Sequence, residues 1–198
     1  PRGGVHPEEH KELSEHCEIQ TPPPPQSVTI PLLQHIGAPA KALVKKKDTV
    51  RKGQLIGEAG GFISANVHAT IGGTVKSIDD IPSPITGQMI EAVTIEADGN
   101  DEWADGCNEE QDPWALDPKS IIDLVQQAGV VGLGGATFPS HVKLSPPPGR
   151  AIEHVLINAA ECEPYITSDY RLMIERPEEI VESLQLIMKT VGAAKGHI

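Results

Sequence analysis

The spacing of hydrophobic positions changes along the chain and separates a β region from a helical region. Between residues 29 and 98, short apolar runs alternate with turns at glycine or aspartate. Short strands that follow one another closely, with such turns between them, are typical of a small β barrel or sandwich. We expect these strands at residues 28–30, 42–44, 55–56, 67–71, 74–78 and 92–95.

From residue 117 the apolar positions recur at the spacing of a helix. Asp117 can cap this helix, Pro118 suits its first turn, and Gly129 is a typical end. A compact apolar strand at 155–157 follows, and then a second helical pattern at 177–192. A strand, a crossover helix and the first residues of a next strand make up only part of an α/β domain. We therefore expect the chain to be a piece of a longer protein.

Two polar segments complete the domain plan. The leader ends in prolines at 22–25, which favour extended polyproline II backbone, and we expect it to lie over the surface. An acidic stretch of the kind that usually forms a solvated linker follows the β region. The expected domains are a polar leader at 1–28, a β domain at 29–98, an acidic linker at 99–116 and the first part of an α/β domain at 117–198.

Composition excludes several classes of function. The 198 residues include 16 Lys and Arg against 28 Asp and Glu, which gives a net charge of −12. Nucleic acids and anionic membrane surfaces both require a basic face, so neither is an expected partner. No apolar run approaches the roughly 20 residues that span a bilayer. Cys17, Cys107 and Cys162 lie far apart, which excludes a disulfide framework and a self-contained zinc or iron–sulfur site.

Clustered glycines follow the first expected helix. Gly132, Gly134 and Gly135 lie within the segment Val131–Pro139, where bare backbone N–H groups can approach and cradle a phosphate. The spacing matches neither the dinucleotide-binding fingerprint nor a P-loop, so an ordinary tight loop remains the alternative. Lys143 adds a positive charge a few residues further on, which favours an anionic ligand.

A polar turn directly follows the expected strand at 155–157. In α/β sheets, ligands bind at the carboxyl ends of strands. The amide of Asn158 can donate and accept hydrogen bonds, and the carboxylates of Glu161 and Glu163 can accept them from ribose or ribityl hydroxyls. A surface turn with solvated acids is the alternative. Neither this turn nor the glycine-rich loop predicts a catalytic side chain.

Two further patterns argue against a carrier and against a metalloenzyme. Residues 48–57 and 64–75 resemble the two halves of a biotinyl or lipoyl hammerhead, but the tip between them, Glu58–Phe62, has no lysine. We therefore expect a structural domain without covalent lipoyl or biotin. Residues 6–10 have the H-x-x-E-H order of some zinc proteases. Their position before any folded core favours exposed histidines, so no metal site is predicted.

Several stretches of the chain match one family in order and spacing. They are the hammerhead segments together with Gly3–Pro7, Pro31–Pro39, Gly132–Pro139, His141–Leu144, Asn158–Tyr165 and Thr167–Met173. Nearly the whole chain thereby resembles the N-terminal part of the C subunit of the Rnf electron-transport complex. The resemblance implies a mixed α+β and α/β fold. A barrel-sandwich-hybrid β domain would precede a truncated flavin- and NADH-type α/β domain, related to the flavoprotein subunit of respiratory complex I.

The resemblance also implies a site for FMN and NADH. In the complex I relative, a glycine-rich loop and an Asn-Ala-Asp-Glu-Gly-Glu-Pro turn hold these molecules. The matching residues in this chain are Gly132, Gly134, Gly135, Phe138, Lys143, Asn158, Glu161 and Glu163. Leu133 and Thr137 stand where the relative has arginine and glycine. Ala160 and Cys162 replace an aspartate and a glycine of the turn, and the lost aspartate removes one flavin contact.

The activity that the resemblance implies is hydride exchange between NAD(H) and FMN, followed by passage of single electrons through 4Fe-4S clusters. The cluster cysteines would lie beyond residue 198, so we expect this stretch alone to be inactive. The whole complex would be an ion-translocating ferredoxin–NAD oxidoreductase. This subunit would be peripheral, on the cytoplasmic face of the bacterial inner membrane, bound to other subunits and coupled to ferredoxin indirectly. The alternative is a non-catalytic module that docks a membrane partner during assembly.

Overall fold

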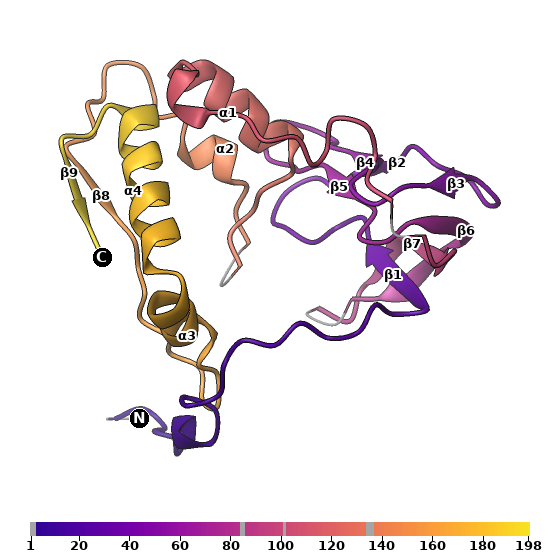
Figure 1. Cartoon of the computed structure of the whole chain (residues 1–198), viewed down its shortest axis with the longest axis horizontal. Helices are drawn as coiled ribbons and strands as arrows, with labels where there is room; N and C mark the ends of the chain where they lie inside the picture. The colour runs from indigo at the N-terminus through magenta and orange to yellow at the C-terminus, as the bar shows by residue number, and fades with distance from the viewer. Residues whose placement is uncertain (1–2, 84–85, 101, 134–136) are drawn as a thin grey trace. The chain divides into compact units, whose positions relative to one another are not determined.

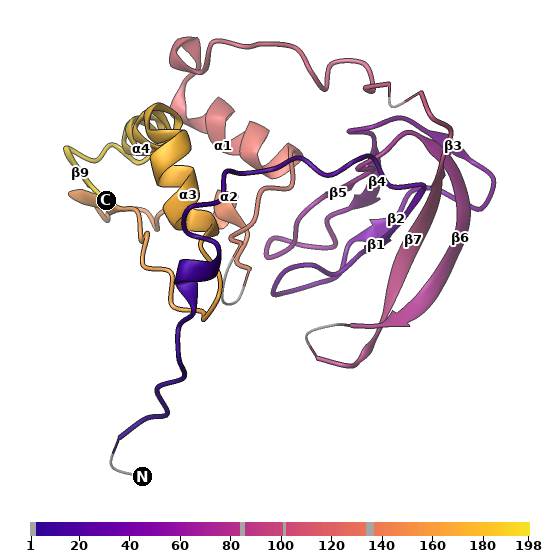
Figure 2. The same ribbon diagram turned by 60° about the horizontal axis from the view of Figure 1, so that its bottom comes forward.

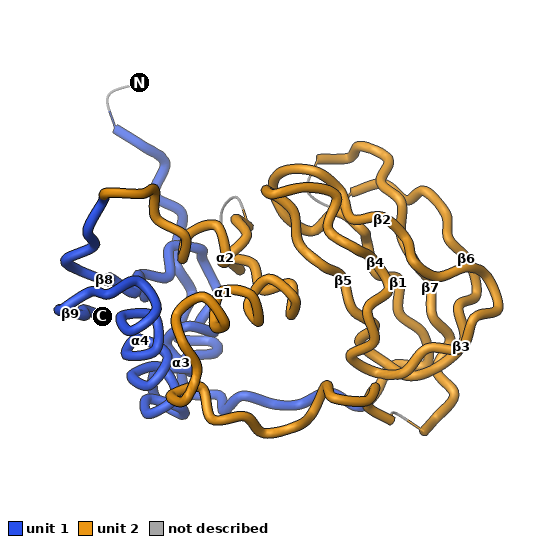
Figure 3. The backbone as a smooth tube through the Cα atoms, turned by 90° about the horizontal axis from the view of Figure 1, so that it is seen from above, with its two compact units in different colours: residues 1–23, 150–198 blue, residues 24–149 orange. Residues whose placement is uncertain are grey.

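The computed structural model describes residues 3–83, 86–100, 102–133 and 137–198, in two compact units. Residues 24–149 form the first, here called the barrel unit. Residues 1–23 and 150–198 form the second, called the α/β unit, as the two colours of Figure 3 show. Residues 1–23 of the leader are thus in the same unit as the last quarter of the chain. The domain boundaries expected from the sequence stay predictions.

The barrel unit contains two antiparallel sheets, drawn in purple and magenta in Figures 1 and 2. Among the described residues, one sheet has the order β1-β7-β6-β3 and the other the order β2-β4-β5. The strands are β1 (Ser27–Pro31), β2 (Lys41–Ala42), β3 (Thr49–Val50), β4 (Leu55–Glu58), β5 (Val67–His68), β6 (Gly73–Pro82) and β7 (Met89–Ala97). Strand β7 pairs with β1 and with β6, so it lies inside the larger sheet.

The inward faces of these strands make one apolar core. Along β1 the register runs from Ser27 opposite Glu96 to Pro31 opposite Ala92. Burial alternates along the first half of β6, as expected for strands with one face on a core. Each fully buried aliphatic side chain contributes about 1.5–3 kcal/mol. The most completely buried aliphatic side chains are Leu32, Val50, Ile56, Val75, Val93 and Ile95.

Two loops of the barrel unit are joined by buried polar side chains instead of by a strand ladder. The Ser64 side chain is fully buried, donates to the Ala38 carbonyl (2.7 Å) and accepts from the Gly60 N–H (2.9 Å). His35 Nε2 accepts from the Ala65 N–H at 3.1 Å. Gly37 adopts φ +108, and a Cβ there would collide with the Ile63 carbonyl. The hammerhead tip is therefore fastened to the loop before β2.

The helical part of the barrel unit comprises η2 (Pro113–Ala115), α1 (Pro118–Gln127) and α2 (Ser140–Lys143). Asp117 caps α1 as the sequence predicts, with its carboxylate 3.0 and 3.2 Å from the N–H groups of Lys119 and Ser120. Part of the acidic stretch pairs with the barrel instead of being wholly solvated. Lys52 donates through its N–H to the Glu102 carbonyl at 3.0 Å, and its ammonium lies 4.9 Å from the Trp103 ring centroid.

The α/β unit has a strand, two helices and a second strand after its leader. Strands β8 (His154–Leu156) and β9 (Lys195–His197) pair in parallel, and α4 (Pro177–Val191) forms the crossover between them. Gly192 ends α4 with φ +72. The predicted strand and second helix are confirmed, whereas α3 (Ser168–Glu175), α2 and the short helix η1 (Lys11–Leu13) were not predicted.

The β region followed by α and β elements confirms the expected fold class. Within the described parts of the chain, none of the helices has the length and apolar character needed to cross a membrane.

Replacing Ser64 by alanine tests the buried junction of the two loops. The Ser64→Ala change removes two part-buried hydrogen bonds, to the Ala38 carbonyl and from the Gly60 N–H, each worth about 0.5–1.5 kcal/mol. We expect a matching loss in the free energy of unfolding, measured with urea. Ser27→Ala, at an exposed position of β1, is the control. Equal unfolding midpoints for both variants would refute the role given to Ser64.

Candidate functional site

The two ends of the glycine-rich loop in the barrel unit are paired through their main chains, and this pairing is called the loop base. Val131 and Pro139 form an isolated antiparallel bridge, and the Gly132 N–H donates to the Phe138 carbonyl at 3.0 Å. The Ser140 N–H adds a bond to the Val130 carbonyl at 2.9 Å. The predicted site residues Gly132 and Phe138 therefore lie opposite each other at this base. Gly134 and Gly135 lie outside the described residues.

Thr137 adopts a backbone conformation that glycine reaches without strain. Its φ is +46, in the left-handed region that β-branched residues rarely occupy. The complex I relative has glycine at the matching position. Strained backbone of this kind collects at ligand-binding loops, where neighbouring structure holds it in place. The conformation is thus present in this chain although the glycine is not.

The tip of the barrel positions the short helix that carries Lys143. His141 on α2 is 3% exposed, and its Nε2 lies 3.1 Å from the Phe62 carbonyl, to which it can donate. The His141 and Phe62 rings also meet edge to face, with centroids 6.0 Å apart. Lys143 is the last residue of α2 and is exposed. The lysine-free hammerhead tip is therefore a docking point for the segment that follows the glycine-rich loop.

The predicted turn of the α/β unit begins where β8 ends. The Asn158 side-chain oxygen accepts from the Ala160 N–H at 3.0 Å, so this side chain shapes the turn itself. Asn158 and Glu163 are exposed, whereas Glu161 is half-buried. These three predicted residues come together in one short segment of the α/β unit, while Gly132, Phe138 and Lys143 belong to the barrel unit.

Glu161 has a structural partner that the sequence did not predict. Its Oε1 accepts from the Ser168 hydroxyl and from the Asp169 N–H, both at 2.9 Å, and so caps the first turn of α3. Burial would raise the pKa of the Glu161 carboxyl, but these hydrogen bonds outweigh it. The positive charge of Lys11 adds to them, and the Glu161 pKa falls below its ordinary value.

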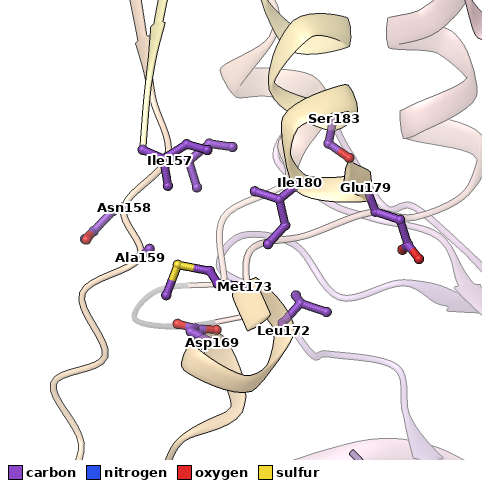
Figure 4. A pocket seen from close by; sticks show the side chains of 10 residues that line it. Ile157, Asn158, Ala159, Asp169, Leu172, Met173, Glu179, Ile180 and Ser183 are labelled. Carbon is purple, nitrogen blue, oxygen red and sulfur yellow. The ribbon is translucent and has the colours of Figure 1, made fainter. Parts of the chain in front are cut away.

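A pocket of about 280 Å³ lies beside this turn, within the α/β unit. Figure 4 shows Met173 and Ile180 directed into it, from α3 and from the start of α4. The amide of Asn158 points away from the other labelled side chains in Figure 4. The pocket wall is mainly apolar, and Asp169 and Glu179 are its charged members. The complete lining is Ile157, Asn158, Ala159, Asp169, Leu172, Met173, Glu179, Ile180, Ser183 and Ile198.

Among the described residues, histidine and cysteine side chains form no group that could hold a metal ion. In the leader, His10 stacks on Tyr165 with ring centroids 5.0 Å apart, and its Nε2 lies 3.1 Å from the Glu8 carboxylate. Across the residues that the structure describes, no group of His, Cys, Asp or Glu is large enough to hold a metal ion. The three cysteines are free and exposed.

Sequence analysis missed Lys11, whose ammonium bonds to the main chain of the Asn158–Glu163 turn and of the residues that follow it. A single lysine in a polar leader carries no local signal of such a role, because its partners lie about 150 residues away in the sequence.

The cap made by Glu161 predicts a pH-dependent contribution to stability. Because folding lowers the Glu161 pKa, its charge stabilises the fold above the ordinary value of 4.5, and this stabilisation is lost as the pH falls through the lowered pKa. Glu161→Gln keeps the shape and removes the charge. We expect the variant to be less stable than the parent at neutral pH, with the gap closing well below pH 4.5.

Urea unfolding across this pH range measures the gap, with the exposed change Glu109→Gln as control. A gap between parent and Glu161→Gln that stays constant with pH would contradict the assignment.

Two family models match different parts of the chain. A family model described as the RnfC barrel sandwich hybrid domain matches residues 1–100. One described as the Nuo51 FMN-binding domain matches residues 125–198.

Curated relatives match over the whole chain. The chain is 44% identical over 197 residues to the C subunit of the proton-translocating ferredoxin:NAD(+) oxidoreductase complex of Clostridium ljungdahlii, covering 100% of this chain and 43% of the relative. It is 43% identical over 197 residues to the C subunit of the Na(+)-translocating ferredoxin:NAD(+) oxidoreductase complex of Acetobacterium woodii, covering 100% and 44%. For the C subunit of the ion-translocating oxidoreductase complex of Rhodobacter capsulatus the identity is 45% over 192 residues, covering 96% and 37%. The chain spans less than half the length of these relatives, and it belongs to the RnfC family, the C subunits of Rnf complexes.

Proposed function

We propose that this chain is the FMN- and NADH-binding part of the C subunit in an ion-translocating ferredoxin:NAD oxidoreductase. The match of residues 125–198 to an FMN-binding domain is the observation that carries the proposal. The subunit would exchange a hydride between NAD(H) and FMN and pass electrons on to 4Fe-4S clusters in the remainder of the protein. Two of the relatives named above are subunits of ferredoxin:NAD(+) oxidoreductase complexes.

The described residues fit the phosphate end of FMN. The loop base puts Gly132 and Phe138 opposite each other, joined by a main-chain hydrogen bond beside the Val131–Pro139 bridge. An exposed lysine ammonium is a donor that phosphate oxygens need. The exposed Lys143 supplies the charge, and His141 fixes its helix to the barrel tip.

The turn of the α/β unit fits the polar and flat parts of the two molecules. With its oxygen bonded to Ala160, Asn158 presents its amide N–H groups as donors. The exposed Glu163 carboxylate can accept hydrogen bonds from ribose hydroxyls of the dinucleotide. The apolar pocket beside the turn matches the flat faces of the ring systems.

In the proposed mechanism the protein binds and orients, and the cofactor supplies the redox chemistry. When bound, FMN would supply the chemistry that links two-electron hydride transfer to single-electron transfer. Glu163 orients the dinucleotide, and Lys143 neutralises phosphate charge. The apolar wall formed by Met173 and Ile180 excludes water from the reacting rings. No side chain of this chain is assigned a proton-transfer step.

The family match supports a proposal for the partners and the location. We propose that the subunit binds the other subunits of its membrane complex on the cytoplasmic face of the cell membrane, and that ferredoxin exchanges electrons with it indirectly. The second candidate is a non-catalytic assembly module. It is favoured by the barrel tip, which has no lysine and packs against α2 through Phe62 and His141. Flavin content of the whole subunit decides between the two.

Lys143→Ala in the whole subunit tests the phosphate contact. Removing one charge-assisted contact costs about 1.5–3 kcal/mol, which raises the dissociation constant of FMN roughly 10- to 150-fold. Flavin fluorescence titration of the apoprotein measures this constant. Lys46→Ala, which removes the same charge from an exposed barrel loop, is the matched control. Unchanged FMN affinity in Lys143→Ala would remove the lysine from the site.

Glu163→Gln tests the dinucleotide contact separately from the flavin contact. We expect FMN to stay bound, while reduction by NADH slows about tenfold, because a charge-assisted hydrogen bond to the dinucleotide is lost. Stopped-flow bleaching of the flavin measures the rate, and Glu109→Gln is the exposed control. Loss of FMN with an unchanged reduction rate per bound flavin would assign Glu163 to the flavin instead.

A further inference from the structure

The polar leader is fastened along residues 161–175 of the α/β unit. Figure 2 shows its short helix η1, in indigo, beside the loop that precedes α3. At the far end of α3, the Ile19 N–H donates to the Glu175 carboxylate at 3.0 Å. Arg171 donates to the Glu15 carbonyl at 3.1 Å and pairs with Glu175 at 2.6 Å. These contacts fix the leader to the helix that follows the candidate turn.

Lys11 makes the central contact between the leader and the turn. Its Nζ lies 2.8 Å from the Glu161 carbonyl, 3.2 Å from the Glu163 carbonyl and 2.9 Å from the Ile166 carbonyl. An ammonium group has three N–H donors, so these carbonyls use its full capacity. The residue is half-buried. The ammonium thus closes a cage of main-chain oxygens that converge on one point.

Tyr165 lies between two of the carbonyls that Lys11 contacts, those of Glu163 and Ile166, and it is also bonded to the leader. Tyr165 adopts φ +68, and its N–H donates to the Glu9 carbonyl at 2.6 Å. The Tyr165 carbonyl accepts from the Ser14 hydroxyl at 3.0 Å, and the ring stacks on His10. A left-handed tyrosine persists only where its surroundings over-determine it. The leader therefore dictates the path of the main chain directly after Glu163.

We propose that Lys11 is a positioning residue for dinucleotide binding. Its ammonium fixes the main chain at Glu161 and Glu163, so that the exposed Glu163 carboxylate is presented in one orientation. The inference rests on the proposed function, because it assigns Lys11 to the same turn. Converging carbonyl dipoles repel one another when the cation between them is removed, so the turn opens without Lys11. A guanidinium is too large and too planar to replace the ammonium at such a point.

The test uses Lys11→Ala in the whole, FMN-loaded subunit. We expect the dissociation constant for NADH, from the concentration dependence of flavin bleaching, to rise on the order of tenfold. The dissociation constant for FMN changes less than about twofold, because Lys11 contacts Glu161, Glu163 and Ile166 and touches neither Asn158 nor Lys143. The control is Lys46→Ala, which makes the same charge change at an exposed position.

Chemical rescue separates positioning from general loss of structure. Truncation to alanine removes a propylammonium unit, so added propylammonium should refill the cage and restore NADH affinity in Lys11→Ala alone. Tetramethylammonium has the same charge and no N–H donor, and should restore nothing. Lys11→Arg should behave like Lys11→Ala. If Lys11→Ala folds only in the presence of propylammonium, it is refolded with this amine, and removal of the amine by dialysis should then weaken NADH binding.

A double-mutant cycle with Glu163→Gln tests whether Lys11 affects NADH affinity through Glu163. If Lys11 acts through Glu163, Lys11→Ala adds little to the loss of NADH affinity already present in Glu163→Gln. Full additivity would overturn the proposal, as would a Lys11→Ala protein that binds NADH like the parent. Rescue of thermal stability by propylammonium without any change in NADH affinity would overturn it too. Failure of the parent subunit to bind FMN or NADH would instead refute the proposed function.

Discussion

The constraint on which both units depend is that main-chain polar groups outside strands and helices must find partners. In the barrel unit, the buried Ser64 hydroxyl links the Ala38 carbonyl to the Gly60 N–H where no strand ladder joins the loops. In the α/β unit, the Lys11 ammonium does the same for carbonyls of Glu161 and its neighbours. Single side chains therefore fix loops close to the candidate binding residues, while the sheets and helices supply a rigid base.

The barrel unit illustrates how a carrier-like fold can serve a different purpose. In a carrier domain the hairpin tip must project so that a lysine-bound group can move. Here the residues of the tip fold back, with Gly60 bonded to Ser64, and the Phe62 carbonyl accepts from His141 at the start of α2. The tip has become a contact surface for the segment that carries Lys143. The tip thereby supports the segment that follows the glycine-rich loop.

Two carboxylates of this acidic chain accept hydrogen bonds from nearby groups at the starts of helices. The Asp117 carboxylate caps α1, and the hydrogen bond from the Ser120 hydroxyl is the main reason that its pKa is lowered. Glu161 caps α3 in the same manner from a position in the turn. The acids at these two helix starts thus have structural partners, whereas Glu163 contributes its carbonyl to the Lys11 cage and keeps an exposed side chain. Of the two acids in the Asn158–Glu163 turn, Glu163 is the one with an exposed carboxylate, and its proposed role rests on that exposure.

Local patterns in the sequence were enough to predict most strands of the barrel, the cap of α1 at Asp117 and the crossover helix α4, because alternation, capping residues and helical spacing involve neighbours along the chain. They also selected the glycine-rich loop and the Asn158–Glu163 turn as candidate sites. The folded chain was needed to reveal that Glu161 caps α3 and that Lys11 closes the carbonyl cage of this turn. Those roles depend on which distant main-chain atoms converge in space, and a lysine in a polar leader has the same local pattern whether it is solvated or caged.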